Sequence, residues 1–207
     1  MVRTTESLHK SLDALAKREK AFAKVLKDHG RPEPRVSEPG VETLLRTIVG
    51  QQVSVAAARS MWNKLSAKFG QPVDLNVLLS ASDEEMREAG MSRQKAGYLR
   101  SLAGLVLSGE LDLARLPEDD EEAIAELVRI KGIGRWSAEI YLLFAEGRHD
   151  VWPAGDLAVQ IQIGKLLGLD GKPTEKQLRE LAERWRPHRG AAAVLAWHSY
   201  NSTGTAL

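Results

Sequence analysis

The segment IKGIGRWSAEIYLLFAEGRHDVWPAGD, Ile130–Asp156, is the most informative stretch of this chain for its fold. A short KGIG turn separates two helical patterns, and Asp156 follows later, after a Trp–Pro pair. Glycine accepts a positive φ and lets another molecule approach the backbone closely. The N–H groups that open the next helix lack intrahelical partners and favour an anion such as phosphate. The segment therefore predicts a phosphate-binding turn between two helices, with a purely geometric role for the glycines as the alternative.

Nearly every stretch outside this segment has a helical pattern. Apolar residues recur at spacings of three, four and seven over Leu8–His29, and the three prolines of Arg31–Gly40 then break the helix. An all-α fold follows, although Val41–Val49 is apolar enough for a strand. Further helices are expected over Val41–Ile48, Val53–Phe69, Ser82–Gly90, Ser92–Leu107, Asp119–Ile130, Trp136–Ala145, Asp156–Leu167, Glu175–Trp185 and Arg189–Tyr200.

Composition excludes several classes of protein. The chain has 207 residues, no cysteine and a net charge of only +1. Disulfides, thiolate zinc sites, cysteine nucleophiles and cysteine-ligated iron–sulfur clusters are therefore excluded. No apolar run is long enough to cross a bilayer, which favours a cytoplasmic protein without a membrane partner. The arginines of Arg179–Arg189 could form a basic surface, but a solvated helix face is the simpler interpretation.

Four ordered motifs resemble one enzyme family. They are LLRTIVGQQVSVAAARSMW (Leu44–Trp62), GMSRQKAGYLRSLA (Gly90–Ala103), the glycine turn with its aspartate, and RWRPHRGAAAVLAW (Arg184–Trp197). Together they resemble the helix-hairpin-helix DNA glycosylase superfamily, and within it the 3-methyladenine DNA glycosylase II group. The resemblance implies two helical lobes with a DNA-binding and active-site cleft between them, approximately 41–120, and 1–40 plus 121–207. It also implies a compact form without the N-terminal β-domain of larger members.

Within this resemblance Asp156 matches the catalytic aspartate. Cleavage of an N-glycosidic bond builds positive charge on the deoxyribose, and a nearby carboxylate stabilises that charge or orients water. Asp156 also stands where a helix N-cap is expected, so it could serve both purposes. Relatives that also cut the DNA backbone carry a lysine where this chain has Trp136, which implies a monofunctional hydrolase that leaves an abasic site.

The base pocket is expected to be aromatic. A flipped purine methylated at N3 or N7 is cationic, and electron-rich rings hold such a base well. Trp136 and Trp197 match the pocket tryptophans of the family. Ile140 stands where one subgroup has a pocket tyrosine, and Tyr141 should face about a quarter-turn away. Three other tryptophans are expected in the core: Trp62, Trp152 and Trp185.

The break at Gly50–Gln52 resembles the loop that fills the gap left by the flipped nucleotide. Gln51 and Gln52 are therefore wedge candidates, and the alternative is that they satisfy backbone groups at a helix break. Four residues match backbone contacts to phosphate: Lys131, Gly132, Gly134 and Ser137. The carbonyls of Val128, Ile130 and Gly132 match a site where relatives hold a structural cation that bridges to DNA. No cofactor is otherwise expected.

The sequence thus predicts a monomeric, nucleoid-associated base excision repair enzyme that removes alkylated purines, such as 3-methyladenine and 7-methylguanine, from double-stranded DNA. One alternative is a non-catalytic helix-hairpin-helix DNA-binding module. Another is a glycosylase for deaminated, etheno or methylated-pyrimidine bases.

Overall fold

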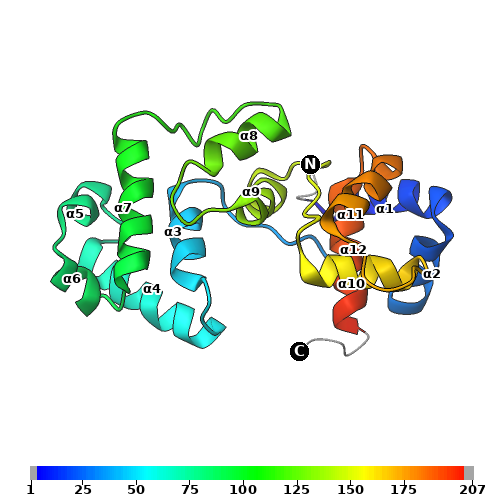
Figure 1. Cartoon of the computed structure of the whole chain (residues 1–207), viewed down its shortest axis with the longest axis horizontal. Coiled ribbons are helices and arrows are strands. Elements are labelled where there is room, and N and C mark those ends of the chain that lie inside the picture. The colour runs from blue at the N-terminus through cyan, green and yellow to red at the C-terminus, as the bar shows by residue number, and fades with distance from the viewer. Residues whose placement is uncertain (1–3, 203–207) are drawn as a thin grey trace. The chain divides into compact units, whose positions relative to one another are not determined.

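The computed structural model describes residues 4–202 and is helical throughout, with no strand in that range (Figure 1). The all-α prediction is confirmed, including over Val41–Val49. The helices are α1 Thr5–Arg18, α2 Lys20–His29, α3 Val41–Gly50, α4 Val55–Phe69, α5 Leu75–Ser80, α6 Asp83–Glu88, α7 Arg93–Leu107, α8 Asp120–Leu127, α9 Arg135–Tyr141, the π-helix η1 Leu142–Glu146, α10 Leu157–Leu166, α11 Glu175–Ala182, the 3₁₀-helix η2 Glu183–Trp185 and α12 Arg189–Ser202. None of these helices is long and apolar enough to cross a membrane.

The chain divides into two compact units. One unit combines Met1–Ser37 with Leu142–Leu207, and the other is the continuous segment Glu38–Tyr141. Residues 121–141 thus belong with residues 38–120, whereas the sequence-based division grouped them with the segment that carries Asp156. The reason is physical: α8 and α9 pack against each other, and α9 also packs against α3 of the continuous unit.

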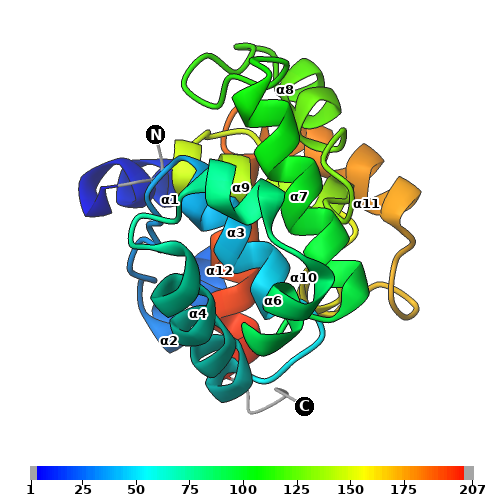
Figure 2. The ribbon, with the colours of Figure 1, turned by 90° about the vertical axis from the view of Figure 1, so that its left-hand side faces the viewer.

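In the continuous unit, α3 is the central helix. It packs against α4, α7 and α9, and α7 runs alongside it in both views (Figure 1; Figure 2). The buried side chains of α3 recur at helical spacing on one face, which is the pattern of an amphipathic helix. These are Leu44, Leu45, Ile48 and Val49. Burial of each such side chain contributes about 1.5–3 kcal/mol.

In the other unit, α12 contacts α1, α2 and α10. Its sequence from Arg189 to Ala196 is rich in small residues, so neighbouring backbones can approach closely. Gly190 shows how closely, because a Cβ there would lie 2.7 Å from the His149 carbonyl oxygen. Trp185 is fully buried between Phe22 and Trp152, with ring centroids 4.9 and 5.4 Å away. The prediction that Trp62, Trp152 and Trp185 are core residues is confirmed.

Several predicted helix starts are confirmed at their caps. Ser82 with Glu85, and Thr174 with Gln177, form capping boxes that open α6 and α11. Three elements differ from expectation. Leu8–His29 is two helices, because Glu19 is extended between α1 and α2. The helix expected to run to Ala145 becomes a π-helix after Tyr141, and α5 was not predicted.

Candidate active site

Asp156 is the N-cap of α10, as the sequence predicted. Its Oδ1 atom accepts a hydrogen bond from the Val159 N–H at 2.9 Å. The same oxygen accepts a second bond, at 3.1 Å, from the indole Nε1–H of Trp197 on α12. Two donors on one oxygen fix the rotamer of the carboxylate, since both are anchored in packed helices. Asp156 is therefore held in one orientation before any substrate arrives.

Trp197 has two contacts that the sequence did not reveal. One edge donates to Asp156, and its ring lies 5.5 Å from the ring of Phe144, centroid to centroid. Phe144 is buried in the π-helix, and the guanidinium of Arg35 lies 5.2 Å from the Phe144 centroid. Such π-helical turns often occur at functional sites. Phe144 therefore packs against the Trp197 indole. No sequence signal distinguished Phe144 from the other apolar residues around it.

The turn that precedes Asp156 is held by a buried glutamine. Gln160 lies one turn into α10 and donates from Nε2 to the Ala154 carbonyl at 2.7 Å. Its Oε1 accepts a bond from Lys172 Nζ at 2.8 Å. Both ends of this amide are therefore satisfied, as burial requires. Two glutamines, Gln160 and Gln162, interrupt the apolar run LAVQIQIG, and this was the sequence signal that could have indicated a buried polar contact here.

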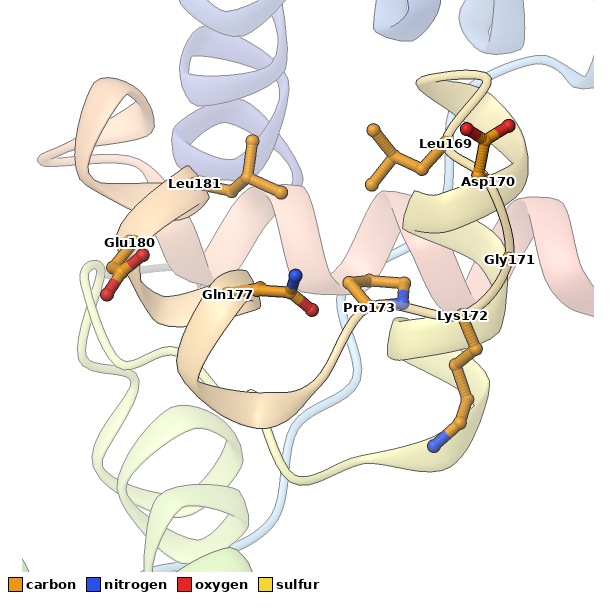
Figure 3. A pocket seen from close by; sticks show the side chains of 8 residues that line it. All are labelled: Leu169, Asp170, Gly171, Lys172, Pro173, Gln177, Glu180 and Leu181. Atoms are coloured by element: carbon orange, nitrogen blue, oxygen red, sulfur yellow. The ribbon is translucent and has the colours of Figure 1, made fainter.

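Lys172 belongs to the loop between α10 and α11, which borders a hollow of about 550 Å³ (Figure 3). In that view the Lys172 side chain points away from Leu169 and Leu181. Its Nζ atom is the one that donates to Gln160. None of the predicted site residues borders this hollow. Its relevance to the site is the support that Lys172 gives to Gln160.

The glycine turn joins α8 to α9, and its two glycines have different surroundings. Gly132 has φ +86°, and a Cβ there would lie 2.2 Å from a ring atom of Tyr98. Gly134 has no heavy atom within 4 Å of such a Cβ, so the space beside it is open. Ile133 between them is 4% exposed, so its apolar side chain is buried. Gly132 is thus required by the fold, whereas Gly134 leaves room for a ligand.

Ion pairs reinforce this hairpin. Arg135 opens α9 and donates to Glu121 of α8 and to the buried Glu139. The hydrogen bond to Glu121 raises the pKa of Arg135 above its usual value, and Glu139 acts in the same direction.

The predicted phosphate contacts of the turn differ in their surroundings. The Lys131 backbone N–H donates to Ser101 Oγ at 3.1 Å, so this amide already has a hydrogen-bond partner within the protein. Of the predicted phosphate contacts, Ser137 is buried and Gly134 is exposed.

Trp136 and Ile140 lie on the same face of α9, since they are four residues apart. Trp136 is 48% exposed, whereas Ile140 is half-buried. Tyr141 is buried, and its hydroxyl accepts the Gly40 N–H at 2.7 Å just before α3 begins. The expectation that Tyr141 points away from the position of Ile140 is consistent with this contact. Trp136 therefore presents a large part of its indole surface to solvent.

The two wedge candidates behave differently. Gln51 ends α3 and donates from Nε2 to the Gly132 carbonyl at 2.8 Å, so it ties α3 to the glycine turn. Gln52 is exposed and has φ +55°, a left-handed conformation that is unusual for a residue other than glycine. Near the end of α3, the Nζ of Lys95 donates to the Val49 carbonyl at 2.6 Å. Burial lowers the pKa of Lys95. Only Gln52 keeps the exposed placement expected of a wedge.

Two of the three carbonyls predicted to hold a cation already accept hydrogen bonds. The Ile130 carbonyl accepts the Ile133 N–H at 3.0 Å, and the Gly132 carbonyl accepts Gln51. Each carbonyl retains a second lone pair. No group of three His, Cys, Asp or Glu side chains capable of holding a metal occurs within residues 4–202. The structural cation at Val128, Ile130 and Gly132 stays a prediction.

The predicted site residues therefore fall into two sets. Asp156 and Trp197 contact each other in the discontinuous unit. The turn, the wedge candidates and the α9 residues Trp136 and Ile140 belong to the continuous unit. His149 and His188, which carried no predicted role, lie outside both sets. His188 contacts Ser11 instead, and burial is the main cause that lowers its pKa.

Comparison with known proteins decides the family. Residues 45–187 match the model of the HhH-GPD superfamily of base excision DNA repair proteins. The chain belongs to this superfamily. The matched region contains Gln51, the glycine turn and Asp156, whereas Trp197 lies beyond it.

Individual members of the superfamily are similar over most of this chain. DNA-3-methyladenine glycosylase 1 of Schizosaccharomyces pombe is 33% identical, over 75% of this chain and 70% of that protein. DNA-3-methyladenine glycosylase 2 of Escherichia coli is 29% identical, over 82% of this chain and 62% of that protein. A Bacillus subtilis relative is 26% identical, and the match spans only 57% of its length.

Solved structures of the superfamily share the fold. The S. pombe 3-methyladenine DNA glycosylase in complex with abasic DNA superposes with a TM-score of 0.77 at 28% identity, covering 94% of this chain and 97% of that one. A DNA-3-methyladenine glycosidase from Bacillus halodurans gives a TM-score of 0.84, also at 28% identity, covering 96% and 91%.

Proposed function

We propose that this chain is a monofunctional DNA glycosylase of base excision repair. It flips alkylated purines, such as 3-methyladenine and 7-methylguanine, out of double-stranded DNA and hydrolyses the N-glycosidic bond. The observation that carries this proposal is the Asp156 carboxylate, held by Val159 and Trp197 in a chain whose superfamily relatives are named 3-methyladenine glycosylases.

The chemistry requires one well-placed carboxylate. Methylation at N3 or N7 gives the base a positive charge, so it departs readily with the bonding electron pair. The deoxyribose then carries positive charge, which the Asp156 carboxylate stabilises. Water adds to the sugar carbon and loses a proton, which leaves an abasic site. Trp136 offers an aromatic face rather than an amine, so no Schiff base forms at that position.

Binding uses the continuous unit. The open space beside Gly134 accepts a phosphate of the DNA backbone, and Gln52 enters the gap left by the flipped nucleotide. The exposed Trp136 stacks on the extruded base. The enzyme works as a monomer inside the cell, on nucleoid DNA, and requires no cofactor.

The test is Asp156→Asn, which keeps the size, the helix cap and the acceptor oxygen while removing the charge. Base release from methylated duplex DNA, measured in single turnovers, should fall by roughly 10²–10³-fold. Asp74→Asn is the matched control, because Asp74 is also an N-cap aspartate, at α5. It should release base at the wild-type rate. Full activity of Asp156→Asn would overturn the mechanism.

A panel of duplexes with single lesions tests the substrate class. We expect release of 3-methyladenine and 7-methylguanine and little release of deaminated, etheno or methylated-pyrimidine bases. Preference for one of those other lesions would keep the glycosylase and replace the substrate. Duplex binding without release of any base would identify a non-catalytic DNA-binding module instead.

A further inference from the structure

A polar hollow lies between α3 and α4 of the continuous unit. It has a volume of about 420 Å³ and is lined by Arg46, Arg59, Trp62, Asn63, Ser66, Ala67 and Gln71. We call it the arginine hollow. It contains two guanidinium groups and no carboxylate.

The two arginines are positioned differently. The Arg46 guanidinium lies 3.9 Å from the ring centroid of Trp62, which is itself buried. This stacking restrains the Arg46 guanidinium, and Arg46 stays exposed to solvent. Arg59 lies on α4 and is exposed. Neither arginine forms an ion pair with any carboxylate in the described range 4–202.

The contrast with the basic C-terminal segment is informative. There, Arg179, Arg184, Arg186 and Arg189 each form a salt bridge with Asp or Glu. The charges of those arginines are therefore paired within the protein. This agrees with the interpretation of Arg179–Arg189 as a solvated helix face. In the arginine hollow no carboxylate pairs with either guanidinium, so a bound anion would interact with two groups that are not already neutralised.

We propose that the arginine hollow binds phosphates of the DNA strand that flanks the lesion, as a backbone contact additional to the glycine turn. This inference rests on the proposed function. Arginine presents a planar fork of donors that matches a phosphate. Asn63 and Gln71 supply further amide donors at the rim. The hollow has no acidic group to repel a polyanion.

The position within the continuous unit supports a DNA segment as the ligand. Gln51 at the end of α3 contacts Gly132, so α3 joins the glycine turn to the hollow. Arg46 precedes Gln51 by five residues. This corresponds to about 7.5 Å along the helix axis, on the order of two base-pair steps of DNA. The axial spacing between the two positions is therefore shorter than the length of one bound duplex.

Salt dependence of binding tests the proposal. A labelled, undamaged duplex is titrated with wild type, Arg59→Gln and Arg46→Gln over a range of NaCl concentrations, with thermal unfolding as the check on folding. Each variant should lower the slope of log K against log salt by about one, because one phosphate contact is lost. Arg87→Gln, an exposed arginine on α6 outside the hollow, is the matched control and should keep the wild-type slope.

Arg59→Gln decides the matter if Arg46→Gln unfolds, because Arg59 does not cover Trp62. A wild-type slope for folded Arg59→Gln would overturn the inference. Inorganic phosphate distinguishes a free anion from DNA. Thermal stabilisation by phosphate that Arg59→Gln abolishes, with an unchanged DNA slope, would also overturn it. Failure of wild type to release any base would instead contradict the proposed function.

Discussion

Gly132 and Gly134 differ in what surrounds them, and alanine separates their roles. Gly132→Ala places a methyl group against the Tyr98 ring at φ +86°. We expect it to lower the free energy of unfolding by about 2–4 kcal/mol. Gly134→Ala meets nothing within 4 Å and should leave the unfolding temperature unchanged.

DNA affinity gives the second half of this prediction. Gly134→Ala fills the space proposed for a phosphate, so it should weaken duplex binding. The expected rise in Kd is roughly tenfold, which corresponds to the loss of about one charge-assisted hydrogen bond. Thermal unfolding and fluorescence anisotropy together measure both effects. Wild-type binding by Gly134→Ala would show that the turn serves only the connection between α8 and α9.

Trp197→Phe tests whether the indole N–H matters beyond the ring. The substitution keeps an aromatic ring next to Phe144 but removes the donor to Asp156. Loss of one hydrogen bond to a carboxylate costs about 1.5–3 kcal/mol, so single-turnover base release should fall roughly 10–100-fold. Affinity for methylated duplex should change far less. A loss confined to affinity would instead assign Trp197 to base stacking alone.

At the scale of elements, the turn that precedes α10 is supported by residues that follow it in the chain. A chain of hydrogen bonds runs from Lys172 through Gln160 to the carbonyl of Ala154. Ala154 lies two residues before Asp156 in the sequence. The loop after α10 therefore supports the turn before it. These two hydrogen bonds satisfy the Gln160 amide at a buried position of an apolar helix.

Gln160→Met removes both bonds and leaves the Ala154 carbonyl buried without its donor. We expect a loss of stability of about 1–3 kcal/mol and a fall in base release of roughly 10–100-fold. Lys172→Met cuts only the outer bond, at an exposed residue. It should unfold at nearly the wild-type temperature with a smaller loss of activity. Equal activity of both variants and wild type would show that the turn holds Asp156 without this support.

At the scale of the whole molecule, the two units differ in continuity. Residues 38–141 are continuous in sequence and carry their own buried residues, whereas the other unit needs segments from both ends of the chain. We expect a fragment of residues 38–141 to unfold cooperatively, as followed by circular dichroism.

The same fragment lacks Asp156. It should bind duplex DNA with a salt-dependent affinity and release no base from methylated DNA. A fragment that is unfolded under conditions where the full chain is stable would show that the continuous unit depends on the other for its fold.

Local signals explain what could be predicted from the sequence. Helix caps such as Ser82, Asp156 and Thr174 involve residues within three positions of one another, so the sequence specifies them directly. The buried face of α3 and the core positions of three tryptophans follow from periodicity and size. The break at Glu19 was missed because Leu8–His29 keeps its apolar spacing across a single extended residue.

The sequence by itself determined the helical fold, the glycine turn and the capping role of Asp156, because each depends on neighbours along the chain. The tertiary structure decided which residues serve these features. Trp197 reaches Asp156 across 41 positions, Gln51 reaches Gly132 across 81, and Tyr98 imposes a glycine at position 132. Such contacts arise only when separate helices pack, and the periodicity of each helix does not specify which residues of different helices meet.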